Sequence, residues 1–266
     1  MTEQPDNHAQ QQQPPRSDRG GDWHFRPAAD HGLGPLERLR STKREQGLIS
    51  WTLHLAALAG LRTTLALLHG FRIEGREHLP AAPPFVMIAN HTSHLDALVM
   101  AAALPRRVGA TTFPVAAGDV FFESAALSAA TAVFINALPL WRKKATGHAL
   151  EDLRSRLLEG QTSLILFPEG ARSRDGQMLP FKSGIGRIVA GTSVPVVPCW
   201  LGGAFEAFRP GTYVPRPRRI TLRVGPPVTF ADQPQDRAGY DAVSAVLREA
   251  VEGLRGREPA CSVRSG

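Results

Sequence analysis

The chain has 266 residues, of which 42% are hydrophobic and 25 are glycine, so a wholly disordered or fibrous protein is excluded. Its two cysteines exclude a disulfide framework and a zinc site built from four cysteines, and they suit a reducing compartment. The formal charge of +7 favours contact with an anionic partner, whether a membrane surface, a phosphorylated cofactor, an acidic carrier protein or nucleic acid.

Residues 1–47 form a polar tail with seven basic and seven acidic residues, so the whole positive excess lies in 48–266. A run of glutamines, paired prolines and paired glycines leaves this tail with too little apolar surface to offset the entropy of ordering. We predict that it is disordered, and it lacks the apolar core of a signal peptide. Residues 256–266 are predicted to form a second, flexible tail.

The segment 48–70 is apolar apart from Arg62 and two histidines. Its length would allow a membrane-spanning helix, but Arg62 would then lie in the bilayer at a cost of at least ~2.5 kcal/mol, and Gly60 interrupts the run. We therefore predict two short helices, 48–59 and 61–70, that contact the membrane interface, with basic residues before them that suit an anionic leaflet. The alternative is a buried helical hairpin that caps the main domain.

Helical and strand patterns alternate over residues 71–255, which predicts a three-layer α/β domain with a central, mixed and largely buried sheet. Apolar runs or alternating patterns predict strands at 71–75, 85–89, 132–135, 163–167, 194–200 and 220–224. Apolar residues at helical spacing predict helices at 94–104, around 150–157 and over 243–254.

The first candidate for chemistry is the segment Asn90-His91-Thr92-Ser93-His94-Leu95-Asp96, which follows a predicted buried strand and opens a helix. Side chains at such a junction face a crevice at the carboxyl end of the strand. The spacing lets Asp96 reach His91, where a carboxylate on one ring nitrogen fixes the tautomer and raises the basicity of the other. A general base for a hydroxyl group is one interpretation, and a histidine capped near a helix start is the other.

The second candidate is Phe167-Pro168-Glu169-Gly170-Ala171-Arg172-Ser173-Arg174, again at the end of an apolar strand. Proline and glycine on either side of Glu169 predict a stiff turn, and the two arginines are suited to clamp a phosphate. Lys182 follows in the segment Phe181-Lys182-Ser183-Gly184. The alternative is a solvated loop whose charges have no function.

Together and in this order, the two segments resemble the motifs of the glycerolipid acyltransferase family, which the 1-acylglycerol-3-phosphate acyltransferases typify. The first resembles the family's block of His, four residues and Asp, and the second its Phe-Pro-Glu-Gly-x-Arg-Ser block. Residues 194–198, Val-Pro-Val-Val-Pro, resemble the apolar fourth block. Residues 71–80 resemble the family's entry strand and 48–69 its membrane-contacting helices, so the resemblance covers about 48–230.

The resemblance implies an enzyme of phospholipid biosynthesis that transfers an acyl group from a thioester donor, acyl-CoA or acyl-carrier protein, to the hydroxyl of a lysolipid. His91 would be the catalytic base and Asp96 would orient it, without a bound cofactor, a metal or a covalent intermediate. Substrate binding would fall to Asn90, Phe134, Asn136, Glu169, Gly170, Arg172, Ser173 and Lys182. The expected partners are a membrane lipid acceptor, an anionic membrane surface and acyl-carrier protein, with the protein peripheral or monotopic on the cytoplasmic face.

One block departs from the family's pattern and leaves the acceptor open. The family's second block usually reads Phe-Ile-Asp-Arg, and its arginine contacts the acceptor's phosphate, whereas this chain has Phe134-Ile135-Asn136-Ala137. A lysophosphatidic-acid-like acceptor is the first expectation, and a lysolipid with another head group, such as a lyso-ornithine lipid, is the alternative. Arg142 follows closely enough to replace the missing arginine.

Other classes of function have less support in the sequence. A non-catalytic membrane lipid-binding protein would tolerate the altered second block, but it would have no need of His91, Asp96 and Glu169 together. The chain has no nucleic-acid recognition motif, so we expect no nucleic-acid partner despite the charge. It also has no Gly-x-Ser-x-Gly elbow, which argues against a serine hydrolase.

Overall fold

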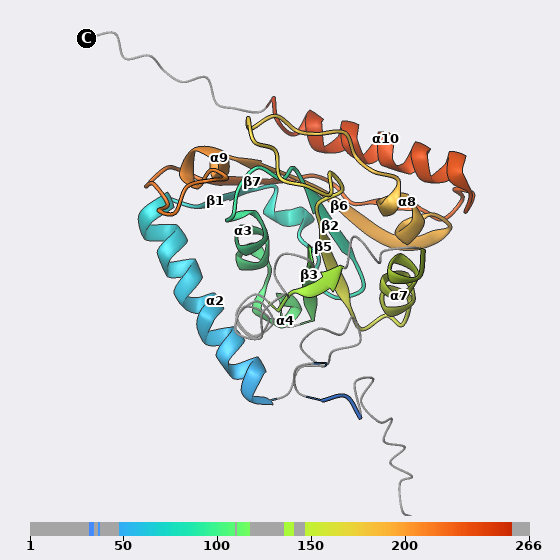
Figure 1. Cartoon of the computed structure of the whole chain (residues 1–266), viewed down its shortest axis with the longest axis horizontal. Helices are drawn as coiled ribbons and strands as arrows, with labels where there is room; N and C mark the ends of the chain where they lie inside the picture. Colours follow the sequence, from blue (N-terminus) through green and yellow to red (C-terminus); the bar gives the residue numbers. More distant parts are fainter. Residues whose placement is uncertain are drawn as a thin grey trace, which may run out of the picture.

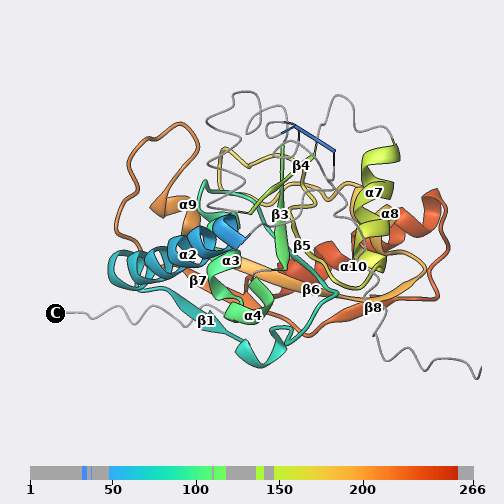
Figure 2. The ribbon, with the colours of Figure 1, turned by 90° about the horizontal axis from the view of Figure 1, so that it is seen from below.

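The computed structural model describes residues 32–34, 37, 48–109, 111–117, 136–140 and 147–256. The two predicted tails lie almost entirely outside these ranges, and the strand predicted at 132–135 lies outside them altogether. The described chain folds around one eight-stranded sheet with helices on both faces (Figure 1, Figure 2). The predicted α/β fold with a mixed central sheet is therefore confirmed.

The sheet has a parallel centre and an antiparallel flank. Its strands are β1 (Arg72–Glu74), β2 (Val86–Ala89), β3 (Thr112–Ala117), β4 (Leu138–Leu140), β5 (Ser163–Leu166), β6 (Thr192–Gly202), β7 (Thr221–Val224) and β8 (Val228–Phe230). They lie in the order β1-β7-β6-β2-β5-β3-β4, with β8 paired to β6. The five strands from β6 to β4 are parallel, whereas β7 and β8 each pair with β6 in the antiparallel sense.

The sequence patterns missed three of these strands, β3, β4 and β8, for identifiable reasons. β4 has only three residues and contains Pro139. β3 contains Pro114, which lacks a backbone N–H and is unfavourable within a strand. β8 has only three residues, too few to show a period of two. β6 extends further than predicted, to Gly202, because β7 continues the pairing up to that residue.

The helices complete two outer layers. They are α2 (Leu48–His69), the 3₁₀ helix η1 (Arg76–His78), α3 (Asp96–Ala103), α4 (Arg106–Gly109), α7 (Gly147–Leu158), α8 (Gly184–Val189), α9 (Ala204–Ala207) and α10 (Arg237–Gly253). Helices α2 and α3 pack together on one face of the sheet, and α7, α8 and α10 pack on the other (Figure 2).

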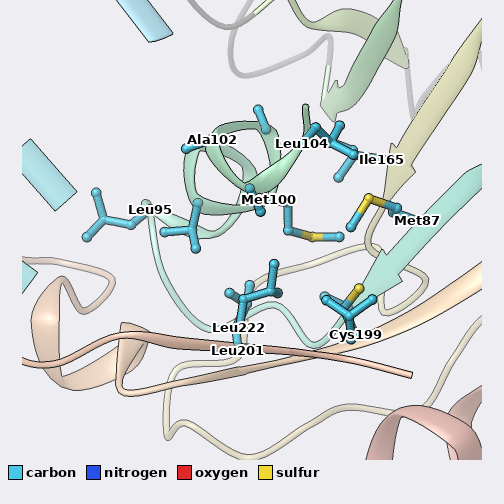
Figure 3. Packing of buried hydrophobic residues seen from close by; sticks show 14 of the residues in the cluster. Met87, Leu95, Met100, Ala102, Leu104, Ile165, Cys199, Leu201 and Leu222 are labelled. Atoms are coloured by element: carbon cyan, nitrogen blue, oxygen red, sulfur yellow. The ribbon is translucent and has the colours of Figure 1, made fainter. Parts of the chain in front are cut away.

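Strand β2 separates two hydrophobic cores because its successive side chains point to opposite faces. Met87 and Ala89 join the core beneath α3, which Figure 3 shows closely packed around Met100 and Leu222. Val86 and Ile88 join the core beneath α7, α8 and α10. All four residues of β2 are fully buried, as the continuous apolar run predicts for a central parallel strand.

Where the sequence predicted a pair of helices, the structure has the single unbroken helix α2, so the prediction of a pair was wrong. Gly60 lies in the exposed part of this helix and does not end it. Leu58 and Leu65 are buried in the core that α2 shares with α3, and this packing offsets the low helix propensity of one glycine. None of the described helices is long and apolar enough to cross a membrane.

The charge of Arg62, which argued against a membrane span, has a partner in the protein. Its Nε donates to the carbonyl of Ala102 at 2.9 Å, and its Nη2 donates to the carbonyl of Leu104. Both carbonyls lie at the C-terminal end of α3, where helix carbonyls lack intrahelical partners and the dipole favours a cation. Arg62 therefore joins α2 to the end of α3.

A second arginine, Arg154 on α7, serves the end of α8 in the same way. Its Nη1 donates to the carbonyls of Ile188 at 3.0 Å and Ala190 at 2.8 Å, and its Nη2 donates to Gln235 Oε1 at 3.0 Å. Arg154, Ile188 and Ala190 are all buried, and buried carbonyls of this kind are ordinarily hydrogen-bonded.

We expect Arg154→Met to lower the free energy of unfolding by about 3 kcal/mol, because it leaves buried carbonyls without a donor. Urea denaturation followed by circular dichroism measures this change. The control is Arg187→Met on α8, whose exposed side chain should contribute no more than about 0.5 kcal/mol. Equal effects of the two substitutions would contradict the structural role of Arg154.

Candidate active site

The two motif segments meet because they follow neighbouring parallel strands. β2 pairs with β5 in a register that aligns Ile88 with Leu166, so both strands end at the same edge of the sheet. The His91 turn, residues 90–96, begins there after β2, and the Glu169 turn, residues 167–174, begins there after β5. The carboxyl ends of parallel strands are the usual place for a site in such a sheet.

His91 and Asp96 form the hydrogen-bonded pair that their spacing predicted. His91 Nδ1 lies 2.9 Å from Asp96 Oδ2, and the same oxygen accepts from the backbone N–H groups of Thr92 at 2.7 Å and Ser93 at 2.8 Å. Three donors thus converge on one carboxylate oxygen. The Nδ1–H tautomer of His91 is thereby fixed, which leaves Nε2 free to accept a proton.

The imidazole of His91 is held in place on its face as well as at its edge. It stacks on the ring of Phe167, with centroids 4.2 Å apart and an interplanar angle of 19°. Its side chain is 22% exposed, whereas that of Asp96 is fully buried. The pair therefore presents one accessible basic nitrogen and keeps its carboxylate away from water.

Glu169 connects the two turns through both of its carboxylate oxygens. Oε1 accepts from the backbone N–H of His91 at 2.7 Å, and Oε2 accepts from the backbone N–H of Leu179 at 2.8 Å. Burial raises the pKa of Glu169 to about 7, although these two hydrogen bonds favour the ionised form. The sequence predicted a substrate-binding carboxylate, and in the structure both of its oxygens accept from backbone N–H groups, one of them that of His91.

Asn90 and Ser173 are also buried and bound to backbone groups. The Asn90 amide donates to the carbonyl of Leu201 at 3.1 Å and accepts from its N–H at 2.7 Å, which ties the His91 turn to β6. Ser173 donates its backbone N–H to the carbonyl of His91 at 2.8 Å, and its hydroxyl donates to Asp175 at 2.7 Å. The described contacts of both side chains are within the protein, and they hold the His91 turn and the Glu169 turn in place.

Gly170 allows the side chain of Lys182 to lie against the Glu169 turn. Its φ of +69° lies in the left-handed region, and a Cβ at this position would be 2.8 Å from Lys182 Nζ. The backbone N–H of Lys182 donates to the carbonyl of Pro168 at 2.9 Å. The exposed side chain of Lys182 thus lies beside the turn.

Arg172 contacts a residue that the sequence motif contains but that was not among the predicted site residues, His94. The guanidinium Nη1 lies 2.8 Å from His94 Nε2, and the imidazole packs on Phe208 with centroids 4.9 Å apart. Burial and the neighbouring guanidinium lower the pKa of His94, so the ring is neutral at neutral pH and can accept from Arg172. Only its position in the His91 turn could have indicated this role.

Two predicted site residues are not placed beside His91. Phe134 lies outside the described residues. Asn136 is buried and its amide lies 3.5 Å from the carbonyl of Thr112, the first residue of β3. Because β3 runs parallel to β5, Asn136 lies level with the amino ends of these strands, opposite the edge that carries His91. Among the described residues no group of three His, Cys, Asp or Glu side chains could hold a metal ion.

The chain is similar in sequence to known proteins. The chain is 33% identical over 171 residues to the human protein named 1-acyl-sn-glycerol-3-phosphate acyltransferase alpha, which covers 60% of this chain and 56% of that one. It is 32% identical over 166 residues to the 1-acyl-sn-glycerol-3-phosphate acyltransferase of Limnanthes douglasii, which covers 62% and 57%. The chain thus spans little more than half the length of these relatives.

A solved structure shares the fold. It is that of the 1-acyl-sn-glycerophosphate (LPA) acyltransferase PlsC from Thermotoga maritima, with a TM-score of 0.58 and 24% identity over 76% of this chain and 80% of that one. The family model described as Acyltransferase matches residues 70–202, which is half of the 266 residues and includes both the His91 turn and the Glu169 turn. The chain therefore belongs to the Acyltransferase family.

Proposed function

We propose that the protein transfers a fatty acyl group from a thioester donor to the hydroxyl of a lysolipid, with a lysophosphatidic-acid-like acceptor. The observation that carries the proposal is the His91–Asp96 pair, which leaves one basic nitrogen accessible at the edge of the sheet. The names of the relatives support the acceptor class. Acyl-CoA and acyl-carrier protein are both suitable donors, because each carries its acyl group as a thioester.

In the proposed reaction, His91 Nε2 accepts the proton of the acceptor hydroxyl while the hydroxyl oxygen attacks the thioester carbonyl. The C–S bond then breaks, and the proton passes from His91 to the departing sulfur. The products are an ester and a free thiol, and no group of the enzyme is acylated. Asp96 Oδ2 holds Nδ1 of His91 and stabilises the imidazolium that forms between the two proton transfers.

The acceptor's phosphate would be bound by Arg172 and Lys182, the cationic side chains fixed beside the two turns. Ala137, which stands where the family usually carries an arginine, is buried and offers no charge. Because Asn136 and Ala137 replace the family's usual Asp-Arg, the alternative acceptor is a lysolipid such as lyso-ornithine lipid. Its head group also carries an anionic group that a guanidinium can bind.

We place the protein on a membrane as a peripheral or monotopic protein, because its acceptor is a bilayer lipid, and on the cytoplasmic face, where acyl-CoA and acyl-carrier protein are available. Leu53 and Leu67 of α2 are exposed and support membrane contact of this helix.

His91→Ala should lower kcat by about 10²–10⁴-fold, the usual effect of losing a general base. Asp96→Asn should also be severe, since an amide can hold the wrong tautomer of His91. The measurement is formation of phosphatidic acid from lysophosphatidic acid and acyl-CoA by mass spectrometry. His148→Ala on α7 is the control, because this exposed histidine lies in another layer. Turnover of His91→Ala within about threefold of the unmodified protein would refute the mechanism.

Arg172→Gln should lower kcat/KM for lysophosphatidic acid by about 10- to 100-fold, because a charge-assisted hydrogen bond to the phosphate contributes about 1.5–3 kcal/mol. Arg187→Gln, which removes an exposed charge on α8, should have little effect. The same assay with lyso-ornithine lipid tests the second acceptor. A higher kcat/KM for lyso-ornithine lipid than for lysophosphatidic acid would replace the proposed acceptor.

The raised pKa of Glu169 predicts how activity and stability depend on pH. Protonation converts one of its oxygens from an acceptor to a donor that faces a backbone N–H, so kcat should fall as the pH drops through about 7. In Glu169→Gln this proton is absent, and the acid limb of the kcat profile should become shallower. The titration of Glu169 affects stability in the opposite direction. The contribution of the protonated side chain to the free energy of unfolding is complete below the pKa of an ordinary Glu, and it is lost as the pH rises through about 7.

Kinetic profiles and urea denaturation of both proteins over the same pH range measure the two effects. An acid limb of equal steepness in the two proteins, together with a pH-independent difference in their free energies of unfolding, would contradict the titration of Glu169.

A further inference from the structure

An arginine-rich loop, residues 209–219, connects α9 to β7. Its sequence, Arg-Pro-Gly-Thr-Tyr-Val-Pro-Arg-Pro-Arg-Arg, contains four arginines and no acidic residue, so it carries a formal +4 of the chain's +7. All four arginines are exposed, and none of them takes part in an ion pair within the described part of the chain. The proposed reaction makes no use of this concentration of unpaired positive charge.

The same loop exposes apolar side chains at its centre. Tyr213 is 95% exposed and Val214 is 74% exposed. Two leucines at the C-terminal end of α2 are also exposed, Leu67 at 80% and Leu68 at 54%. In Figure 1 and Figure 2 the orange loop lies beside this end of α2, and a hydrogen bond of 3.0 Å between His69 Nδ1 and the carbonyl of Arg218 joins the two segments.

Backbone hydrogen bonds anchor the base of the loop to neighbouring segments, although its tip is exposed. The backbone N–H of Arg216 donates to the carbonyl of Ala207 at 2.7 Å, and that of Ile220 donates to the carbonyl of His69 at 3.0 Å. Three prolines further restrict the backbone between these anchors. The loop therefore presents its apolar tip without a large loss of conformational entropy on binding.

We propose that this loop, together with Leu67 and Leu68, is a docking surface for an anionic phospholipid bilayer. Tyr213 and Val214 enter the headgroup layer, where an amphipathic ring can bury its apolar body and keep its hydroxyl hydrated. The four arginines bind the lipid phosphates around them, each contributing about fivefold to membrane affinity. A protruding loop suits a bilayer better than a folded acidic protein, because lipids rearrange around a convex tip, whereas a rigid partner needs a matching groove.

The loop is connected directly to the His91 turn. The hydroxyl of Ser93 donates to the carbonyl of Phe208 at 2.8 Å, and His94 packs on the Phe208 ring. Residue 208 immediately precedes the loop, so docking brings the carboxyl edge of the sheet to the bilayer surface. This consequence rests on the proposed acyl transfer to a lysolipid, whereas docking itself does not.

A fluorescent label at the tip tests the docking directly. In a full-length Cys261→Ser background, Tyr213→Cys carries an environment-sensitive fluorophore, and the remaining Cys199 stays unlabelled because it is buried with a raised thiol pKa. Emission should shift to the blue on addition of phosphatidylcholine vesicles that contain phosphatidylglycerol, and high salt should diminish the shift. The matched control is Glu249→Cys, an exposed position on α10 on the other face of the sheet.

No shift at position 213, or an equal shift at position 249, would overturn the proposal. A shift that acyl-carrier protein produces and vesicles do not would also overturn it, and it would assign the surface to an acidic protein.

Vesicle flotation of charge variants provides an independent measurement. Arg216→Gln with Arg218→Gln should lower the partition coefficient onto anionic vesicles about 30-fold. Arg187→Gln with Arg237→Gln removes the same charge from α8 and α10, and it should change the coefficient less than about twofold. Equal losses of vesicle binding in the two double variants would show that net charge alone explains the binding, and they would overturn the proposal.

Activity assays separate this proposal from the proposed function. The loop variants should keep their activity on a short-chain lysophosphatidic acid dissolved in water and lose it on acceptor embedded in vesicles. If the protein transfers no acyl group to either acceptor, the proposed function fails, while the label and flotation results still decide whether the loop docks.

Discussion

The carboxylate of Glu169 joins segments of the chain that are far apart in the sequence. One oxygen accepts from the backbone of His91 after β2, and the other accepts from Leu179 beyond the Glu169 turn. Because the group is buried, loss of either hydrogen bond would leave a polar atom unpaired in a medium of low dielectric. These hydrogen bonds tie the backbone of the His91 turn to the Glu169 turn. The proposed general base is thus held by a side chain that needs no contact with substrate.

Other buried polar side chains hold the same turn from different directions. Asn90 binds β6, Ser93 binds the backbone of Phe208, and the backbone of Ser173 binds the carbonyl of His91. Fixed hydrogen bonds of this kind keep the nitrogen of a base within reach of its substrate, which is the source of much of the rate gain from positioning. The buried polar residues of the two motifs thus hold the His91 turn in place, whereas His91, Arg172 and Lys182 have partly or fully exposed side chains.

The central sheet makes this frame rigid. β2 and β5 are buried on both faces by separate hydrophobic cores, and the two turns leave their carboxyl ends side by side. Site residues can then lie on short loops without losing their geometry, since close-packed cores have low compressibility and keep the strand ends in place. The loop 209–219 extends this arrangement to the surface, because Phe208, the residue before the loop, is also a contact of the His91 turn.

The sequence by itself determined the α/β class, most of the strands and the His91–Asp96 pair. These features depend on local patterns: apolar runs mark strands buried on both faces, and a spacing of five residues across a strand–helix junction brings an imidazole to a carboxylate. Tertiary structure decided the features whose partners are distant in the chain. Arg62 binds the end of α3 across 40 residues, Glu169 binds His91 across 78, and Asn90 binds Leu201 across 111. A periodic sequence pattern cannot indicate such contacts, because they depend on which strands and helices become neighbours. For that reason the sequence did not show that α2 is one helix, or that Glu169 and Asn90 bind backbone groups next to the site.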